Sequence, residues 1–161
     1  MIPKIMDLIN KTNSFQIIPA YTDKKTPEKP YGSYVIISTS TKNLGPTYSK
    51  YDDIKDVHIE KSRYRETVQV QFDIYSDGEI EALNKGRELR NLIIFQLRHQ
   101  WGRIDTGIVL FTSIENKREE IKGKYEYRTT FDVTFEYMTL SEEREVEIAR
   151  EIDLIVKKFK N

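Results

Sequence analysis

The chain has 161 residues and a mass of 19.1 kDa, which is enough for a single domain with a sizeable core. Its 26 basic and 26 acidic side chains give a formal net charge of zero. Proteins that bind nucleic acid through its phosphates usually carry an excess of Lys and Arg, so no specific nucleic-acid partner is expected. The absence of cysteine and the presence of only two histidines, His58 and His99, argue against disulfides, zinc and other cofactors.

Neither export nor membrane insertion is predicted. The first residues show no basic run followed by an apolar stretch, as a secretory signal would. Nowhere does the chain approach the roughly 18 consecutive apolar residues that a membrane span needs. We therefore expect a soluble protein with no membrane contact.

The first quarter of the sequence predicts a helix, an arm and a strand. Apolar residues at helical spacing, with Pro3 in the first turn, predict a short amphipathic helix over residues 3–12. Three prolines favour an extended, mobile arm over residues 16–30. The β-branched run YGSYVIISTST then predicts a strand over residues 31–41.

A polar stretch follows over residues 42–65, with a Gly-Pro turn signal and many Lys, Asp and Tyr residues. Loops of this length are uncommon inside a compact domain and are usually functional or disordered. The alternative is a protruding hairpin, in which residues 57–64 extend the next strand. The sequence leaves both interpretations open.

Strict alternation of apolar and polar residues predicts a half-buried strand over residues 67–75. Ser76 to Glu79 matches a capping box, and apolar residues at helical spacing then predict a central helix that ends near Gly102.

The last third predicts two more strands and a helix. A short apolar strand is expected over residues 107–114, followed by a charged hairpin loop over residues 115–124. Alternation then predicts a strand over residues 125–137, and Ser141 is a suitable N-cap for a terminal helix. The predicted order is α-β-β-α-β-β-α. It indicates a single α+β domain with a four-stranded, mostly antiparallel sheet and helices packed on one face.

One set of residues suggests catalysis. Asp105, Glu115 and Lys117 follow the acid, acid, lysine pattern of small metal-dependent nucleases, in which carboxylates hold Mg²⁺ and the lysine stabilises developing charge. Such spacings arise by chance in a chain of which 32% is charged. The sequence lacks a nucleophile elbow and a Gly-rich phosphate loop, so we expect a protein that is not an enzyme.

A contact surface for partners is the stronger hypothesis. Lys and Arg alternate with tyrosines in residues 42–65, and Tyr and Arg are enriched at interface hot spots. A solvated loop and a generic adaptor domain are the alternatives. The residues that we expect to contact a partner or another subunit are Lys50, Tyr51, Lys55, Lys61, Arg63, Tyr64, Lys117 and Arg118.

The order of predicted elements and the sequences of their strands resemble those of a known family. The Pro-rich arm leads into PYGSY at residues 30–34, the strand VQVQFDIYS at 68–76 runs into the central helix, and the strand RTTFDVTFEY follows at 128–137. Over about residues 1–140 these features resemble the neck or tail-terminator proteins of tailed bacteriophages and prophage-like elements.

The resemblance implies a structural role in the virion tail or neck, with assembly in the host cytoplasm. Such proteins form rings, commonly hexameric, that cap the tail tube and stop its polymerisation. The implied partners are further copies of the chain, the tail-tube protein and a head-completion or connector protein. The resemblance implies no active site.

Overall fold

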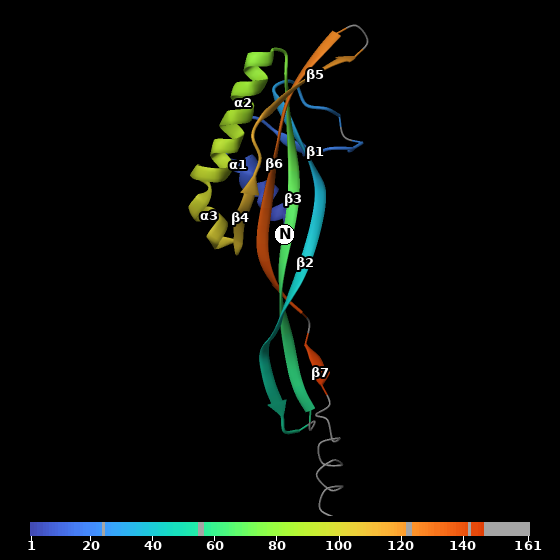
Figure 1. Cartoon of the computed structure of the whole chain (residues 1–161), viewed down its shortest axis with the longest axis vertical. Coiled ribbons are helices and arrows are strands. Elements are labelled where there is room, and N and C mark those ends of the chain that lie inside the picture. Colours follow the sequence, from blue (N-terminus) through green and yellow to red (C-terminus); the bar gives the residue numbers. More distant parts are fainter. Residues whose placement is uncertain (24, 55–56, 122–123, 142, 147–161) are drawn as a thin grey trace, which may run out of the picture. The chain divides into compact units, whose positions relative to one another are not determined.

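The computed structural model describes residues 1–23, 25–54, 57–121, 124–141 and 143–146 (Figure 1). The chain forms two compact units, which we call the core unit and the hairpin unit. The core unit comprises residues 1–40 and 66–137, and the hairpin unit comprises residues 41–65 and 138–161. Two long strands, β2 (Tyr31–Asp52) and β3 (Val57–Ser76), contribute to both.

Within the described residues the sheet has seven strands and is mixed, so the predicted four-stranded antiparallel sheet is wrong. Its main path runs β1-β2-β3-β6-β4, while β5 also pairs with β6 and β7 pairs with β3. The remaining strands are β1 (Ile17–Pro19), β4 (Thr106–Phe111), β5 (Glu115–Ile121), β6 (Lys124–Leu140) and β7 (Arg144–Val146). Three of these strands, β1, β5 and β7, lie where the sequence predicted an arm, a loop and a helix.

A side-chain amide positions β1, the parallel strand, inside the predicted arm. Asn10 donates its Nδ2 hydrogen to the carbonyl of Ile17 and accepts the amide hydrogen of Ile17, both at 2.9 Å. This pair of bonds imitates strand pairing and holds Ile17 beside Gly32, its partner on β2. The residues after β1 lead to a cis peptide bond between Lys29 and Pro30, directly before β2.

The core lies between the helices and the apolar side chains of β3 and β6. Helix α1 (Ile2–Thr12), which the periodicity correctly predicted, contributes the fully buried Ile5 and Ile9. Alternate residues of β3 and β6 are buried, as their period of two predicted, and the rings of Phe72 and Phe131 stack at 5.4 Å between centroids. Every buried hydrophobic residue among those described belongs to the core unit.

The predicted central helix is interrupted by a π turn. It consists of α2 (Glu79–Asn91), the π-helical η1 (Leu92–Gln96) and α3 (Arg98–Arg103). In η1 the amide of Leu97 bonds to the carbonyl of Leu92 rather than to that of Ile93. The indole Nε1 of Trp101 donates to the Ile93 carbonyl at 2.8 Å, which satisfies the acceptor that the π turn displaces.

The predicted capping box at the start of this helix is wrong. The N-cap is Gly78, and no side chain caps the helix. Ser76 instead donates a hydrogen bond to the side chain of Glu81. Two acidic residues in the first turn, Glu79 and Glu81, complement the helix dipole in place of the cap.

Helix α2 approaches β6 closely at Gly86. A Cβ atom at this position would lie 2.6 Å from the Cγ2 atom of Thr129, which is fully buried. The contact requires glycine because the clash would be with a side chain held inside the core. It fixes the separation between the helix and the sheet.

The predicted loop over residues 115–124 is instead β5 and the start of β6. All seven residues of β5 pair antiparallel with β6, from Glu115 opposite Thr130 to Ile121 opposite Lys124. The stretch, ENKREEI, lacks apolar alternation, so the period of two that indicates a half-buried strand is missing. Its charged sequence therefore favoured a loop where the described residues form paired strands.

In the hairpin unit, β2 and β3 extend well beyond the predicted strand ends at residues 41 and 67. The predicted helix cap Ser141 forms a pair of bonds with Ser62: its Oγ accepts from the Ser62 amide, and its own amide donates to the Ser62 carbonyl, both at 2.8 Å. Residues 144–146 then form β7 beside β3. The rest of the predicted terminal helix lies outside the described residues.

Candidate interaction surfaces

The described residues of the hairpin unit form a surface without a core. None of them is buried, and apolar side chains at Leu44, Tyr48 and Tyr51 are between 40% and 46% exposed. The ring of Tyr51 lies 5.3 Å from that of His58, across the hairpin. Such a surface offers apolar and aromatic contact area to a partner, because its side chains are not buried inside the unit.

The predicted contact residues fall into two groups, one in each unit. Lys50, Tyr51, Lys61, Arg63 and Tyr64 lie on β2 and β3 of the hairpin unit, while Lys117 and Arg118 lie on β5 of the core unit. Lys55 lies outside the described residues.

The predicted residues of the hairpin unit are positioned by strands. Lys50 and Arg63 are exposed, whereas Tyr64 is half-buried. Lys61 forms an ion pair of 2.9 Å with Glu143, so part of its charge is balanced within the unit. The strand geometry therefore presents Lys50 and Arg63 to solvent as the more accessible cations.

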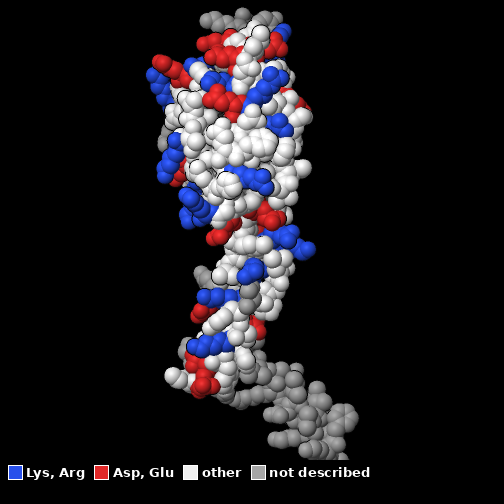
Figure 2. Space-filling model, turned by 90° about the vertical axis from the view of Figure 1, so that its left-hand side faces the viewer, with Lys and Arg blue, Asp and Glu red and all other residues white. Residues whose placement is uncertain are grey.

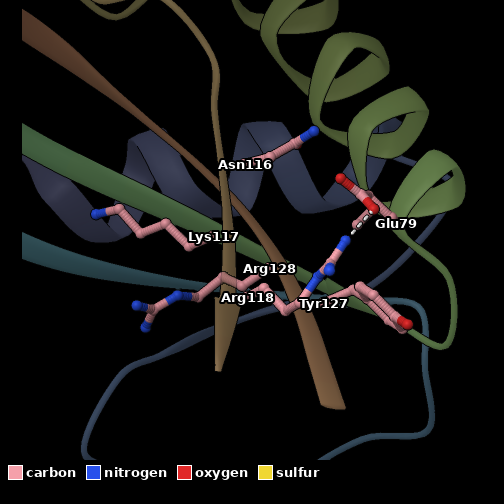
Figure 3. Close-up of a pocket in the computed structure, with 7 residues that line it drawn as sticks. Glu79, Asn116, Lys117, Arg118, Tyr127 and Arg128 are labelled. Carbon is pink, nitrogen blue, oxygen red and sulfur yellow. Dashed lines mark hydrogen bonds and ion pairs between the residues drawn. The ribbon is translucent and has the colours of Figure 1, made fainter. Parts of the chain in front are cut away.

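A shallow pocket of about 250 Å³ lies beside β5, between the start of α2 and β6 (Figure 3). Arg118 reaches Glu79 there with an ion pair of 2.6 Å and lies over the ring of Tyr127 at 5.7 Å. Lys117 and Arg128 are cross-strand partners and extend away from Glu79 (Figure 3). The pocket thus holds the ion pair of Arg118 with Glu79, while Lys117 and Arg128 lie on the opposite side of the β5–β6 pair, where Arg128 lies 3.8 Å from Asp73.

The arm and the polar face of the sheet enclose a second pocket. It is lined by residues of the arm together with Tyr31, Asp73 and Tyr75, and the two tyrosine rings stack at 4.9 Å. Burial raises the pKa of Tyr31 to about 12, and the neighbouring carboxylate of Glu126 acts in the same direction. The buried Asp73 lies 3.8 Å from Arg128. These contacts join neighbouring strands beside the arm, since Tyr31 lies on β2, Asp73 and Tyr75 lie on β3, and Arg128 lies on β6.

The three residues of the nuclease hypothesis do not meet. Asp105 directly precedes Thr106, which pairs with Tyr137, whereas Glu115 pairs with Thr130. These two positions are seven residues apart on β6. At about 3.3 Å per residue, they are separated by more than about 20 Å. Carboxylates bind one metal ion at 2.0–2.6 Å, so Asp105 and Glu115 cannot share a cation.

The same conclusion holds more widely for metal sites. Within the described part of the chain, no group of three or more His, Asp or Glu side chains lies close enough to hold a metal ion. Asp52, Asp53 and Glu60, the described acids near His58 in the sequence, do not form such a group. No helix among the described residues has the length and apolar character required to cross a membrane.

The sequence did not predict the apolar surface along β4. Val109 and Leu110 are 57% and 61% exposed, and Phe95 in the π turn is 68% exposed. A groove of about 340 Å³ lies between η1, α3 and β4, and Ile94, Ile108 and Phe111 are among its lining residues. The run GIVLF was predicted as a short apolar strand, and its position at the sheet edge leaves much of it uncovered.

Comparison with known proteins adds one finding. A family described as phage neck terminator protein matches residues 3–160 of the chain. No curated protein matches the chain. The match covers both units, including the residues of the predicted contact surface.

Proposed function

The chain belongs to the phage neck terminator family, a family of structural proteins of the virion neck or tail, and we propose from this that it forms a ring that caps the tail tube. The ring, a hexamer in this proposal, is assembled in the host cytoplasm. One of its faces contacts the last ring of tube subunits and stops their polymerisation. The other contacts a head-completion or connector protein. The protein acts by assembly and not by catalysis.

Family membership alone does not say which part of the chain contacts a partner. The observation that supports such an assignment is that the hairpin unit buries none of its described residues. Its strands are held by backbone pairing and by contacts such as Ser62 with Ser141, while its described side chains remain at least partly exposed. Strand β7 adds a short third strand beside β3, but small sheets usually need a buried hydrophobic face to be stable on their own, and contact with a partner would supply one. We assign the contact with tube or connector to this unit, centred on Lys50, Tyr51 and Arg63.

Tube growth tests this proposal directly. The full chain is added to polymerising tail-tube protein of the same phage, and tube lengths are measured by negative-stain electron microscopy. We expect shorter tubes with extra density at one end. Tubes of unchanged length, with no bound protein at either end, would overturn the proposal.

Matched variants then test the assigned surface. Arg63→Ala removes an exposed cation of the hairpin unit, whereas Arg87→Ala removes an exposed cation of α2 in the core unit. We expect Arg63→Ala to weaken the capping of tubes and Arg87→Ala to leave it unchanged. Equal effects of the two substitutions would show that the contact does not depend on the hairpin unit.

A further inference from the structure

The core unit exposes two segments of sheet edge that lack the usual protection against pairing. On one side, β1 pairs with β2 only as far as Tyr34, and the described residues supply no further strand beside residues 35–40. On the other side, β6 is the one strand among the described residues that pairs with β4. Each open segment is six residues long: VIISTS on β2 and TGIVLF on β4. We call them the β2 edge and the β4 edge.

Neither edge contains a charged residue or a proline, although 32% of the chain is charged. Proteins normally protect open edges with charges, especially lysine, or with proline, because unpaired backbone groups bind other strands. The continuation of the β4 edge along β6 is protected in this way, since β5 has the sequence ENKREEI. Of the two strands that pair with β6 along this side of the sheet, β4 is therefore uncharged and β5 is rich in charge.

Both edges carry exposed apolar side chains. Ile36 and Ile37 on the β2 edge are 46% and 49% exposed. The pairing of β4 with β6 shifts register between Ile108 and Leu110, and Val109 and Leu110 are both largely exposed. Bulges can protect an edge, but here the irregular position presents apolar side chains instead of charged ones.

The helix-bearing side of the core unit is also divided into charged and uncharged surface. In Figure 2, charged side chains gather in patches, and uncharged surface lies between them. The groove between η1 and β4 adds the exposed ring of Phe95 to the apolar residues of the β4 edge. A strand paired to the β4 edge would cover apolar surface as well as gain backbone hydrogen bonds.

We propose that the β4 edge of one copy pairs with the β2 edge of the next copy, so that the sheet continues from subunit to subunit around the ring. The two edges have equal length, both are uncharged, and each chain has one of each. A closed ring needs this type of contact, in which two different surfaces of identical chains meet head to tail. The inference rests on the proposed self-assembly and assigns its subunit contact.

Strand direction agrees with this pairing. Strands β2, β3, β6 and β4 alternate in direction across the core unit (Figure 1), and β4 is antiparallel to β6. Rotation about a ring axis preserves the direction of strands that run along that axis. The β2 edge of the next copy is then antiparallel to β4 and continues the alternation.

Engineered cysteines test the pairing, because the chain has none of its own. Four double variants combine Val109→Cys or Leu110→Cys with Ile36→Cys or Ile37→Cys, which samples neighbouring registers. Within one chain the two edges are three strand spacings apart, about 14 Å, and a disulfide needs Cα atoms about 4.4–6.8 Å apart. Any disulfide between them therefore joins two copies. The control combines Glu115→Cys, on the charged β5, with the same two β2 positions.

We expect assembled protein to form covalent dimers and higher multiples under mild oxidation in at least one of the four variants, and not in the control. Rings that form without a disulfide in any of the four variants would overturn the edge pairing and leave the proposed function intact. A chain that neither self-assembles nor binds tubes would overturn both. As a second test, Leu110→Lys places a lysine on the β4 edge, and loss of assembly is expected. Glu115→Lys, the matched substitution on β5, should retain assembly, and equal behaviour of the two lysine variants would contradict the pairing.

Discussion

The two units of this protein use the same two long strands in different ways. In the core unit, β3 places Val70, Phe72 and Ile74 in a fully buried core. In the hairpin unit, the same strand buries none of its described residues. The difference teaches that one strand can provide stability at one end and an accessible surface at the other. Substitutions in the core unit should therefore change global stability, whereas those in the hairpin unit should act locally or on assembly.

The largest effect is expected from truncating the aromatic stack of the core. Phe131→Ala removes a ring that is 1% exposed and stacks on Phe72. We expect the free energy of unfolding to fall by about 3–5 kcal/mol. Tyr48→Ala, at a residue that is 46% exposed in the hairpin unit, should change it by less than about 0.5 kcal/mol. Urea titration of both variants measures the contrast, and similar losses would mean that the hairpin unit shares the core.

The close approach of α2 to β6 gives a prediction of unusual sign. Gly→Ala inside a helix normally stabilises by about 1 kcal/mol, but Gly86→Ala should destabilise by about 1–3 kcal/mol because its Cβ meets Thr129. Thermal unfolding measures the change, and an increase in stability would disprove the contact.

Two further variants isolate that clash. Thr129→Ser removes the offending methyl group and keeps the hydroxyl that donates to Asn116, so the double variant should recover much of the loss. Gly102→Ala adds a Cβ with no atom within 4 Å and should not destabilise the protein.

A smaller, local effect is expected in the hairpin unit. Ser141→Ala removes the Oγ acceptor of the Ser62 amide and should weaken this contact by about 1 kcal/mol. Hydrogen exchange at the Ser62 amide should become faster, while the global unfolding free energy stays nearly unchanged. A matching loss of global stability would show that the two units unfold as one cooperative body.

The smallest effect concerns alkaline pH. Burial, followed by a hydrogen bond with Glu66, raises the pKa of Tyr137 to about 12, and burial does the same for Tyr31. A free tyrosine ionises near pH 10, so folding favours the neutral form. The resulting stability is complete below pH 10 and is lost as the pH rises toward 12. Tyrosinate absorbance should show a late step that shrinks in Tyr137→Phe, and a step of unchanged size would contradict this assignment.

The sequence correctly predicted the elements in which a regular spacing of apolar residues shows which face is buried. The period of two in β3 and β6 and the helical period of α1 follow directly from burial of one face, and the structure confirms them. The central helix was found as well. Its π turn was not predicted, because no local pattern shows that the Trp101 indole bonds to the carbonyl of Ile93, which the turn leaves without its helical partner.

The elements that the sequence missed are set by pairing and topology. Strand β5 is charged throughout most of its length, and only its partner β6 makes it a strand. Strand β1 has three residues, too few for any periodicity. A short apolar strand was predicted over residues 107–114, and β4 forms there, but the pattern did not show that strand order places β4 at the margin of the sheet. Strand order results from contacts between residues distant in the sequence, and the local pattern of one sequence does not reveal these contacts.

The central claim is that identical chains close into a ring through contacts of the core unit and use the hairpin unit to engage their neighbours in the virion. Native mass measurement of the full chain, alone and bound to tail-tube ends, with negative-stain images of the same samples, tests it most directly. We predict a single closed ring, six copies in this proposal, at one end of each tube. A chain that remains monomeric in solution and is absent from tube ends would contradict the account.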